Sequence, residues 1–167
     1  MKINDYQLKE RVADAVYASS LALNDEDWDG FLSFCDADNF RYRITNYSPE
    51  IRKEQCWMER DWKGLKTLFD LLPKHNTNHS PLTRHATVYS VAKDNGSNHI
   101  AAISLLTIYR TQLDAMNSHF ESGQTILFAV GKYEDRFCLD ENGVARLVER
   151  NVKLDTRQID VGSHIPF

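Results

Sequence analysis

The chain has 167 residues with 7 Gly and 4 Pro, and 42% of its residues are apolar, 26% charged and 11% aromatic. This length matches about one domain that buries roughly two-thirds of its unfolded surface, and the composition excludes a disordered or fibrous protein. The net charge of −4, without a run of basic residues, excludes a nucleic-acid-binding protein, and the lack of a long apolar run excludes a membrane protein. Residues 1–10 carry no export signal, so we expect a cytoplasmic protein.

Two helices are expected in the first 35 residues. Apolar residues recur at helical spacing from Leu8 to Leu23, behind an N-cap at Asn4 or Asp5. This pattern predicts a helix with one buried stripe. A short second helix is expected to begin within residues 24–27, whose acidic side chains suit a helix N-terminus.

A strand and a third helix are expected next. Phe40, Tyr42 and Ile44 alternate with polar residues, which predicts a strand with one buried face. Apolar residues then keep helical spacing from Lys53 to Leu72, until a proline follows. We therefore expect a helix over residues 53–72.

Four long strands complete the predicted fold, at residues 84–93, 99–111, 125–139 and 144–159. The dipeptide Asn95-Gly96 lies between the first and second of these strands, and Asn142-Gly143 lies between the third and fourth. Both dipeptides close tight turns, so the strands are expected to form two antiparallel hairpins. Gly131 is interpreted as a bulge or bend. The pattern predicts one domain over residues 1–167, an α+β cone in which about three N-terminal helices pack on a strongly curved antiparallel sheet.

The chain offers few ligands for inorganic chemistry. Its three cysteines are widely spaced and form no CxxC pair, so neither a disulfide framework nor a zinc site is predicted. They are Cys35, Cys56 and Cys138. His75 and His79 would share a metal only within a helix, and the prolines on both sides of them favour a loop.

One enzymatic arrangement is compatible with this composition. In a cone with an internal cavity, His85 or Tyr89 from one strand and Tyr42 from another would form an acid/base site of the kind used by isomerases and dehydratases. The alternative is that His85 is a histidine of the core or of an interface. Alternation along the strand does not distinguish the two, because it does not say which face borders a cavity.

The last hairpin and the tail carry features that suit subunit contacts. Basic residues recur through the hairpin, and they belong either to a solvated sheet edge or to buried or intersubunit ion pairs. They are Arg136, Arg146, Arg150, Lys153 and Arg157. Ile165 and Phe167 are apolar residues in a segment where polar residues are usual, so we interpret the segment as docking on a partner.

Three passages of the chain form a recognisable pattern, namely DEDWDGFLSFCDADNFRYRIT at residues 25–45, SPLTRHATVYSV at residues 80–91 and RLVERNVKLDTRQI at residues 146–159. They resemble the small (β) subunit of aromatic-ring-hydroxylating dioxygenases, the Rieske non-haem iron oxygenases. The third is the most specific, and GSHIPF at residues 162–167 extends it. The resemblance covers nearly the whole chain.

The resemblance implies an NTF2-like, or cystatin-like, fold and a division of labour with a large α subunit, commonly in an α3β3 hexamer with β–β contacts. In this family the α chain holds a Rieske [2Fe–2S] cluster and a mononuclear Fe(II), and a reductase or ferredoxin delivers electrons from NADH. This sequence contains neither Cys-x-His nor Cys-x-x-His. The resemblance therefore implies that this chain contributes no catalytic residue, cofactor or metal ligand.

Three hypotheses follow. The first is a non-catalytic structural subunit of an oxygenase that hydroxylates an aromatic carboxylate, with small sulfonates or other aromatics as alternatives; its expected subunit contacts are Arg157, His164 and Phe167. The second is a self-sufficient isomerase or dehydratase that uses the cone residues named above. The third is a ligand-binding module on the same fold.

Overall fold

The computed structural model describes residues 5–75, 79–94, 96–113, 122–159 and 165–167. Three helices and six strands are defined within these ranges. In chain order they are α1 (Asp5–Asn24), α2 (Trp28–Ser33), β1 (Arg41–Ser48), β2 (Lys53–Asp61), α3 (Trp62–His75), β3 (Leu82–Lys93), β4 (Ile100–Thr111), β5 (Thr125–Leu139) and β6 (Ala145–Leu154).

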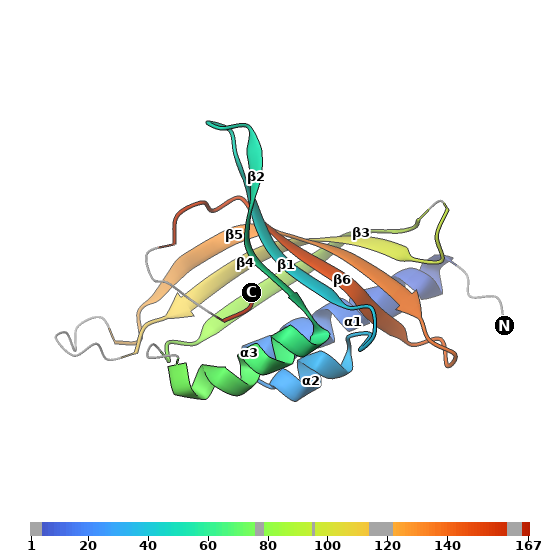
Figure 1. Ribbon diagram of the computed structural model, residues 1–167, viewed down its shortest axis with the longest axis horizontal. Coiled ribbons are helices and arrows are strands. Elements are labelled where there is room, and N and C mark those ends of the chain that lie inside the picture. Colours follow the sequence, from blue (N-terminus) through green and yellow to red (C-terminus); the bar gives the residue numbers. More distant parts are fainter. Residues whose placement is uncertain (1–4, 76–78, 95, 114–121, 160–164) are drawn as a thin grey trace.

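The six strands form one sheet in the order β2-β1-β6-β5-β4-β3 (Figure 1). The two expected hairpins, β3–β4 and β5–β6, are confirmed, and β4 also pairs with β5. The sheet is mixed, however, because β1 pairs in parallel with β6. This pairing joins the first strand to the last, and turn dipeptides indicate only pairings between neighbours in sequence.

All three helices lie on one face of the sheet, and the opposite face is open (Figure 1). Along α1 the buried residues Leu8, Val12, Val16 and Leu23 form the expected stripe against the core. The three-helix α+β fold is therefore confirmed. Within the described ranges, no helix has the length and apolar character that crossing a membrane requires.

The short helix α2 begins as its sequence predicts. Asp27 is its N-cap, and its carboxylate accepts a hydrogen bond from the backbone N–H of Gly30 at 2.9 Å. The helix places Phe31 in the core, where its ring packs edge-to-face on the ring of Phe69 of α3, with 6.1 Å between the ring centroids. Trp28 stacks on the same Phe69 at 4.7 Å. Aromatic packing therefore holds α2 against α3.

The helix expected over residues 53–72 is wrong in its first half. Residues Lys53–Asp61 form β2, and only Trp62–His75 form the helix α3. The expected end at Leu72 is also wrong, because α3 continues through Pro73 to His75. β2 is exposed along almost its whole length, so it lacks the alternation of apolar and polar residues that indicates a strand. Asp61 marks the transition, because its carboxylate accepts a hydrogen bond from the N–H of Gly64 at 2.7 Å.

Gly131 of β5 pairs with Leu154 of β6 and lies against the β6 backbone. The register shifts of β5 lie at other positions, so the interpretation of Gly131 as a bulge is wrong. A Cβ atom at this position would lie 2.3 Å from the carbonyl oxygen of Lys153 and 2.8 Å from the Cα atom of Leu154. Both are backbone atoms, which cannot move aside as a side chain can. The residue is therefore required by the contact between two strands and not by a ligand.

Replacing Gly131 with alanine is expected to lower the free energy of unfolding by about 1–3 kcal/mol, because the added methyl group forces β5 and β6 apart. Urea denaturation of the purified chain measures this change. Lys132→Ala is the matched control, since the neighbouring side chain is partly exposed and its loss should change stability by less than about 0.5 kcal/mol. Equal stability of the two variants would contradict the close-contact explanation.

Candidate functional site

The structure does not bring the three candidate acid/base residues together. His85 and Tyr89 lie on the open face of β3, where Tyr89 is 72% exposed and His85 contacts Tyr109 of β4. Tyr42 is fully buried on the other face, beneath the helices. Since one residue of the set lies across the sheet from the other two, the cone-cavity site predicted from His85, Tyr42 and Tyr89 is not formed.

The polar interior of the cone is instead centred on an ion pair between Arg150 of β6 and Asp135 of β5. Two hydrogen bonds of 3.0 and 2.8 Å join the guanidinium to the carboxylate, and both side chains are completely buried. The guanidinium lies 4.0 Å from the ring centroid of Tyr133 and donates a further bond to the Ser19 hydroxyl. Burial opposes the charge on Arg150, but Asp135 more than offsets it and raises the pKa of the guanidinium.

A second buried arginine holds the end of the described chain. Arg84 of β3 donates hydrogen bonds to the carbonyl oxygens of Leu23 and Leu82, both at 3.1 Å, and to that of Pro166 at 2.5 Å. Burial lowers the pKa of Arg84. Beside it, the hydroxyl of Tyr42 bonds to both the N–H and the carbonyl oxygen of Phe167 at 2.8 Å.

These interior groups are poorly suited to catalysis. Burial raises the pKa of Tyr42 and of the Cys35 thiol, so neither is activated as a base or a nucleophile. Among the described residues, no three His, Cys, Asp or Glu side chains gather into a possible metal site. Cys35 is buried, Cys56 lies exposed on β2 and Cys138 lies on β5, so the cysteines are not placed to bind an iron–sulfur cluster together.

Sequence reasoning overlooked Asp135, although a signal for it exists. Tyr133, Asp135 and Phe137 occupy alternate positions of β5, and the two aromatic residues face the core. A carboxylate between them must also face inward, and a buried carboxylate requires a cationic partner. Arg84 follows the same logic, since it alternates with buried Leu82 and half-buried Ala86 on β3.

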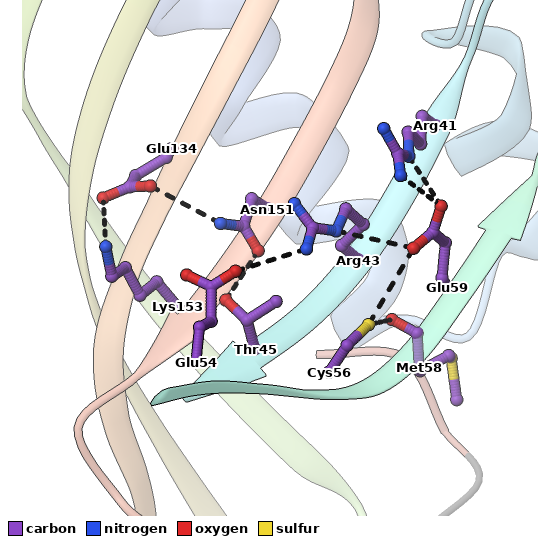
Figure 2. A network of polar contacts seen from close by, with 10 residues as sticks. All are labelled: Arg41, Arg43, Thr45, Glu54, Cys56, Met58, Glu59, Glu134, Asn151 and Lys153. Carbon is purple, nitrogen blue, oxygen red and sulfur yellow. Dashed lines mark hydrogen bonds and ion pairs between the residues drawn. The ribbon is translucent and has the colours of Figure 1, made fainter. Parts of the chain in front are cut away.

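On the open side of the sheet, a row of polar side chains crosses β1, β6 and β5 (Figure 2). The hydroxyl of Thr45, which is fully buried, donates to the amide oxygen of Asn151 at 2.9 Å. The amide nitrogen of Asn151 lies 3.4 Å from a carboxylate oxygen of Glu134, and Lys153 pairs with the same carboxylate at 3.5 Å. This row forms the floor of a polar site.

Charged pairs between β1 and β2 form one wall of this site (Figure 2). Arg43 lies between two glutamates of β2, with Glu54 at 3.2 Å and Glu59 at 3.7 Å. Arg41 also pairs with Glu59. An open pocket of about 430 Å³ lies between Arg43 and Glu54 of the wall and Glu134 and Asn151 of the floor, and Ile103 of β4 borders it. Because opposite charges neutralise one another here, the network pins β2 to the sheet and does not present an unpaired catalytic group.

Next to this polar site, the open face carries exposed apolar side chains. Leu105 of β4 is 54% exposed and Leu127 of β5 is 59% exposed, while Ile103 is 40% exposed. The strand register places these residues with His85 and Tyr109 on the face away from the helices. We call Tyr89, Ile103, Leu105, Tyr109 and Leu127 the apolar strip. Its exposure is typical of a surface that is covered in a larger assembly.

The basic residues of the last hairpin divide into one buried pair and several exposed pairs. Only Arg150 forms a buried ion pair. Arg136 pairs with Glu149 at 3.8 Å and Arg146 with Asp140 at 3.1 Å, with partly exposed side chains. The interpretation as buried ion pairs is therefore correct for Arg150. The interpretation as a solvated sheet edge is wrong, because β5 and β6 are interior strands of the sheet.

The predicted contact residues lie in different environments. Arg157 is exposed and pairs with Glu50 of the β1–β2 turn, with one contact of 2.6 Å. Phe167 is only 2% exposed and packs against Phe128 of its own chain, so its side chain leaves little surface for a partner. His164 lies outside the described residues. Docking of Ile165 and Phe167 thus takes place within the chain itself.

The Glu50–Arg157 pair predicts a shifted titration. Hydrogen bonds from Arg157 lower the pKa of Glu50 from its ordinary value of 4.5 to about 2. The pair therefore stabilises the folded chain above pH 4.5, and this contribution is lost as the pH falls through about 2. Carboxyl NMR should show Glu50 titrating near pH 2 in the native chain and at a clearly higher pH in Arg157→Gln, although still below 4.5 because the Ser48 hydroxyl continues to donate to Glu50. An unchanged midpoint in the variant would contradict the pairing.

Comparison with known proteins identifies the family, although no family model matches the chain. The chain is 42% identical over 159 residues to the methanesulfonate monooxygenase hydroxylase subunit beta of Methylosulfonomonas methylovora. The aligned region covers 95% of this chain and 86% of that protein. It is 31% identical over 156 residues to the 2-aminobenzenesulfonate 2,3-dioxygenase subunit beta of an Alcaligenes species, covering 93% and 97%. The chain belongs to the β subunits of the ring-hydroxylating oxygenases. It is therefore a subunit of an oxygenase.

Solved structures support the same fold. The β subunit of an aromatic-ring-hydroxylating dioxygenase from Novosphingobium aromaticivorans superposes with a TM-score of 0.74 at 21% identity, over 96% of this chain and 97% of that one. A cystatin-like protein from Nostoc punctiforme superposes with a TM-score of 0.57 at 12% identity, over 94% and 97%. The β subunit thus has the expected NTF2-like, or cystatin-like, fold.

Proposed function

We propose that this β subunit is a non-catalytic structural component that stabilises an α/β oxygenase oligomer of the α3β3 type, with β–β contacts. The observation that carries the proposal is the 42% identity with an oxygenase β subunit over 95% of the chain. The absence of a metal-binding group among the described residues agrees with iron centres in another chain. The partner α subunit would then hold the Rieske cluster and the mononuclear Fe(II), and would receive NADH-derived electrons from a reductase.

For the substrate, we propose an organosulfonate. The sequence analysis preferred an aromatic carboxylate and kept small sulfonates as an alternative. Both relatives are named for a sulfonate substrate, which is methanesulfonate for one and 2-aminobenzenesulfonate for the other. The relative named for methanesulfonate is the more similar to this chain, with 42% identity against 31%. This pattern favours the sulfonate alternative and, within it, a small alkanesulfonate.

A substrate panel tests this choice. The complex of the β subunit with its α chain, supplied with the reductase and NADH, is assayed for substrate-dependent O2 uptake with methanesulfonate, 2-aminobenzenesulfonate and benzoate. We expect the fastest turnover with methanesulfonate. Turnover of benzoate but of neither sulfonate would reject the sulfonate proposal and leave the assignment of the β subunit intact.

We further propose that the open sheet face contacts the α subunit. Obligate interfaces are large and apolar at their centre, and the apolar strip combines several exposed hydrophobic side chains on one face. The polar site beside the strip supplies the charged rim that such interfaces carry. Arg157 pairs with Glu50 of the β1–β2 turn. It remains a candidate for a contact with the α subunit at this rim.

A further inference from the structure

The interior of the cone contains a ready-made place for an anion, which the end of the chain now fills. We propose that the space held by Pro166 and Phe167 is a binding site for a small aromatic acid, a carboxylate or a sulfonate, and that the chain's own tail competes with this ligand. The proposal concerns the β subunit alone and does not depend on the proposed oxygenase substrate.

The first observation is the shape of the occupied space. The Phe167 ring packs edge-to-face on Phe128, with 5.6 Å between ring centroids, and both residues are buried. Arg110 lies over the Phe128 ring at 5.5 Å. The tail thus places one phenyl ring in a slot with an aromatic wall, and a free aromatic molecule of similar size has the same complementarity.

The second observation is the polar end of the slot. The guanidinium of Arg84 and the hydroxyl of Tyr42 both bind backbone atoms of the tail, with Pro166 and Phe167 as partners. A guanidinium with a phenol beside it is an arrangement that recognises the oxygens of a carboxylate or a sulfonate. In the described structure the Arg84 guanidinium binds the backbone carbonyl oxygen of Pro166, an acceptor that is weaker than an anion.

The third observation is a pair of buried N–H groups without acceptors in the described part of the chain. Arg84 and Arg150 are both buried, and burial lowers the pKa of Arg84. Asp135 pairs with Arg150. Within the described residues, no carboxylate side chain pairs with Arg84, and neither its Nε nor the Nη1 of Arg150 has a hydrogen-bond partner. These two buried N–H groups favour a ligand that brings further acceptor oxygens into the interior.

Competition between tail and ligand has a measurable consequence. If the tail occupies the slot more than about 90% of the time, the apparent dissociation constant of the ligand is at least about tenfold weaker than its intrinsic value. Loosening the tail should therefore tighten binding by at least tenfold. A ligand that binds elsewhere would gain nothing from this change.

Isothermal titration calorimetry with benzenesulfonate and benzoate tests the proposal on the full chain and on Ile165→Ser/Phe167→Ser. We expect at least tenfold tighter binding to the double variant, competition by the peptide acetyl-Ile-Pro-Phe, and no binding of the neutral probe benzyl alcohol. Adding Arg84→Gln to the double variant should abolish binding of both acids. Equal affinity of the native and double-variant chains, or binding that survives Arg84→Gln, would overturn the proposal.

Hydrogen exchange in the native chain provides a test that does not need a folded variant. The Phe167 N–H donates to the Tyr42 hydroxyl, so its exchange is slow while the tail is docked. Benzenesulfonate added to increasing concentration should accelerate this exchange along a saturating curve. Exchange that stays constant at every concentration would also overturn the proposal.

Discussion

Asp135→Ala is expected to lower the free energy of unfolding of the chain by about 3–5 kcal/mol, the largest effect of any single substitution considered for this fold. The substitution removes the carboxylate that binds Arg150 through two hydrogen bonds, while Arg150 stays completely buried. An unpaired guanidinium then remains beneath the helices, beside Tyr133 and Phe31. Urea denaturation followed by circular dichroism measures the change.

Two control variants separate the charge effect from a general weakness of β5. Arg136→Gln, next in sequence, removes a largely exposed partner of Glu149 and should change stability by less than about 1 kcal/mol. Asp135→Leu/Arg150→Met replaces both buried charges by apolar groups and should recover most of the loss. A loss below 1 kcal/mol in Asp135→Ala would mean that the pair does not hold the interior together.

The second large effect is expected in assembly. Leu105→Glu/Leu127→Glu places two carboxylates on the apolar strip, where both side chains are more than half exposed in the single chain. If this face contacts the α subunit, each carboxylate should weaken the complex by about 2 kcal/mol or more, so that the affinity of the double variant falls by about a thousandfold. Size-exclusion chromatography with light scattering, on co-expressed α and β chains, measures the loss of the complex.

The matched control lies on the helical side of the molecule. Leu21 of α1 and Leu71 of α3 are 58% and 40% exposed, and Leu21→Glu/Leu71→Glu introduces the same charge there. We expect this control to assemble normally. Normal assembly of the sheet variant together with failure of the helix variant would move the interface to the helical side and reject the open-face proposal.

Local patterns in the sequence predicted most of the fold. The stripe of α1, the alternation of Tyr42 with its neighbours and the turn at Asn142-Gly143 each depend on residues close in sequence. These signals were sufficient for three helices on one face of a curved sheet. They also predicted the β5–β6 hairpin, because Gly143 has the positive φ that such a turn requires.

The features that sequence reasoning missed depend on long-range contacts. β2 is exposed on both faces, so Lys53–Asp61 carries no period that distinguishes it from a helix. The parallel pairing of β1 with β6 and the docking of Phe167 on Tyr42 join residues more than 100 positions apart. Such contacts leave no local signal. The face on which His85 lies was undetermined for the same reason, since alternation fixes two faces without saying which one the helices cover.

Reconstitution tests the central claim, that the β subunit builds the oxygenase without taking part in its chemistry. The α chain is produced alone and together with the β subunit, and iron content, oligomeric state and sulfonate-dependent NADH oxidation are measured on the same samples. We predict one stable complex in which all of the iron is bound by the α chain. Turnover should require the β subunit for assembly and should be unchanged by His85→Ala. A β subunit that stays monomeric beside its α chain, or that binds iron or turns over substrate alone, would contradict the account.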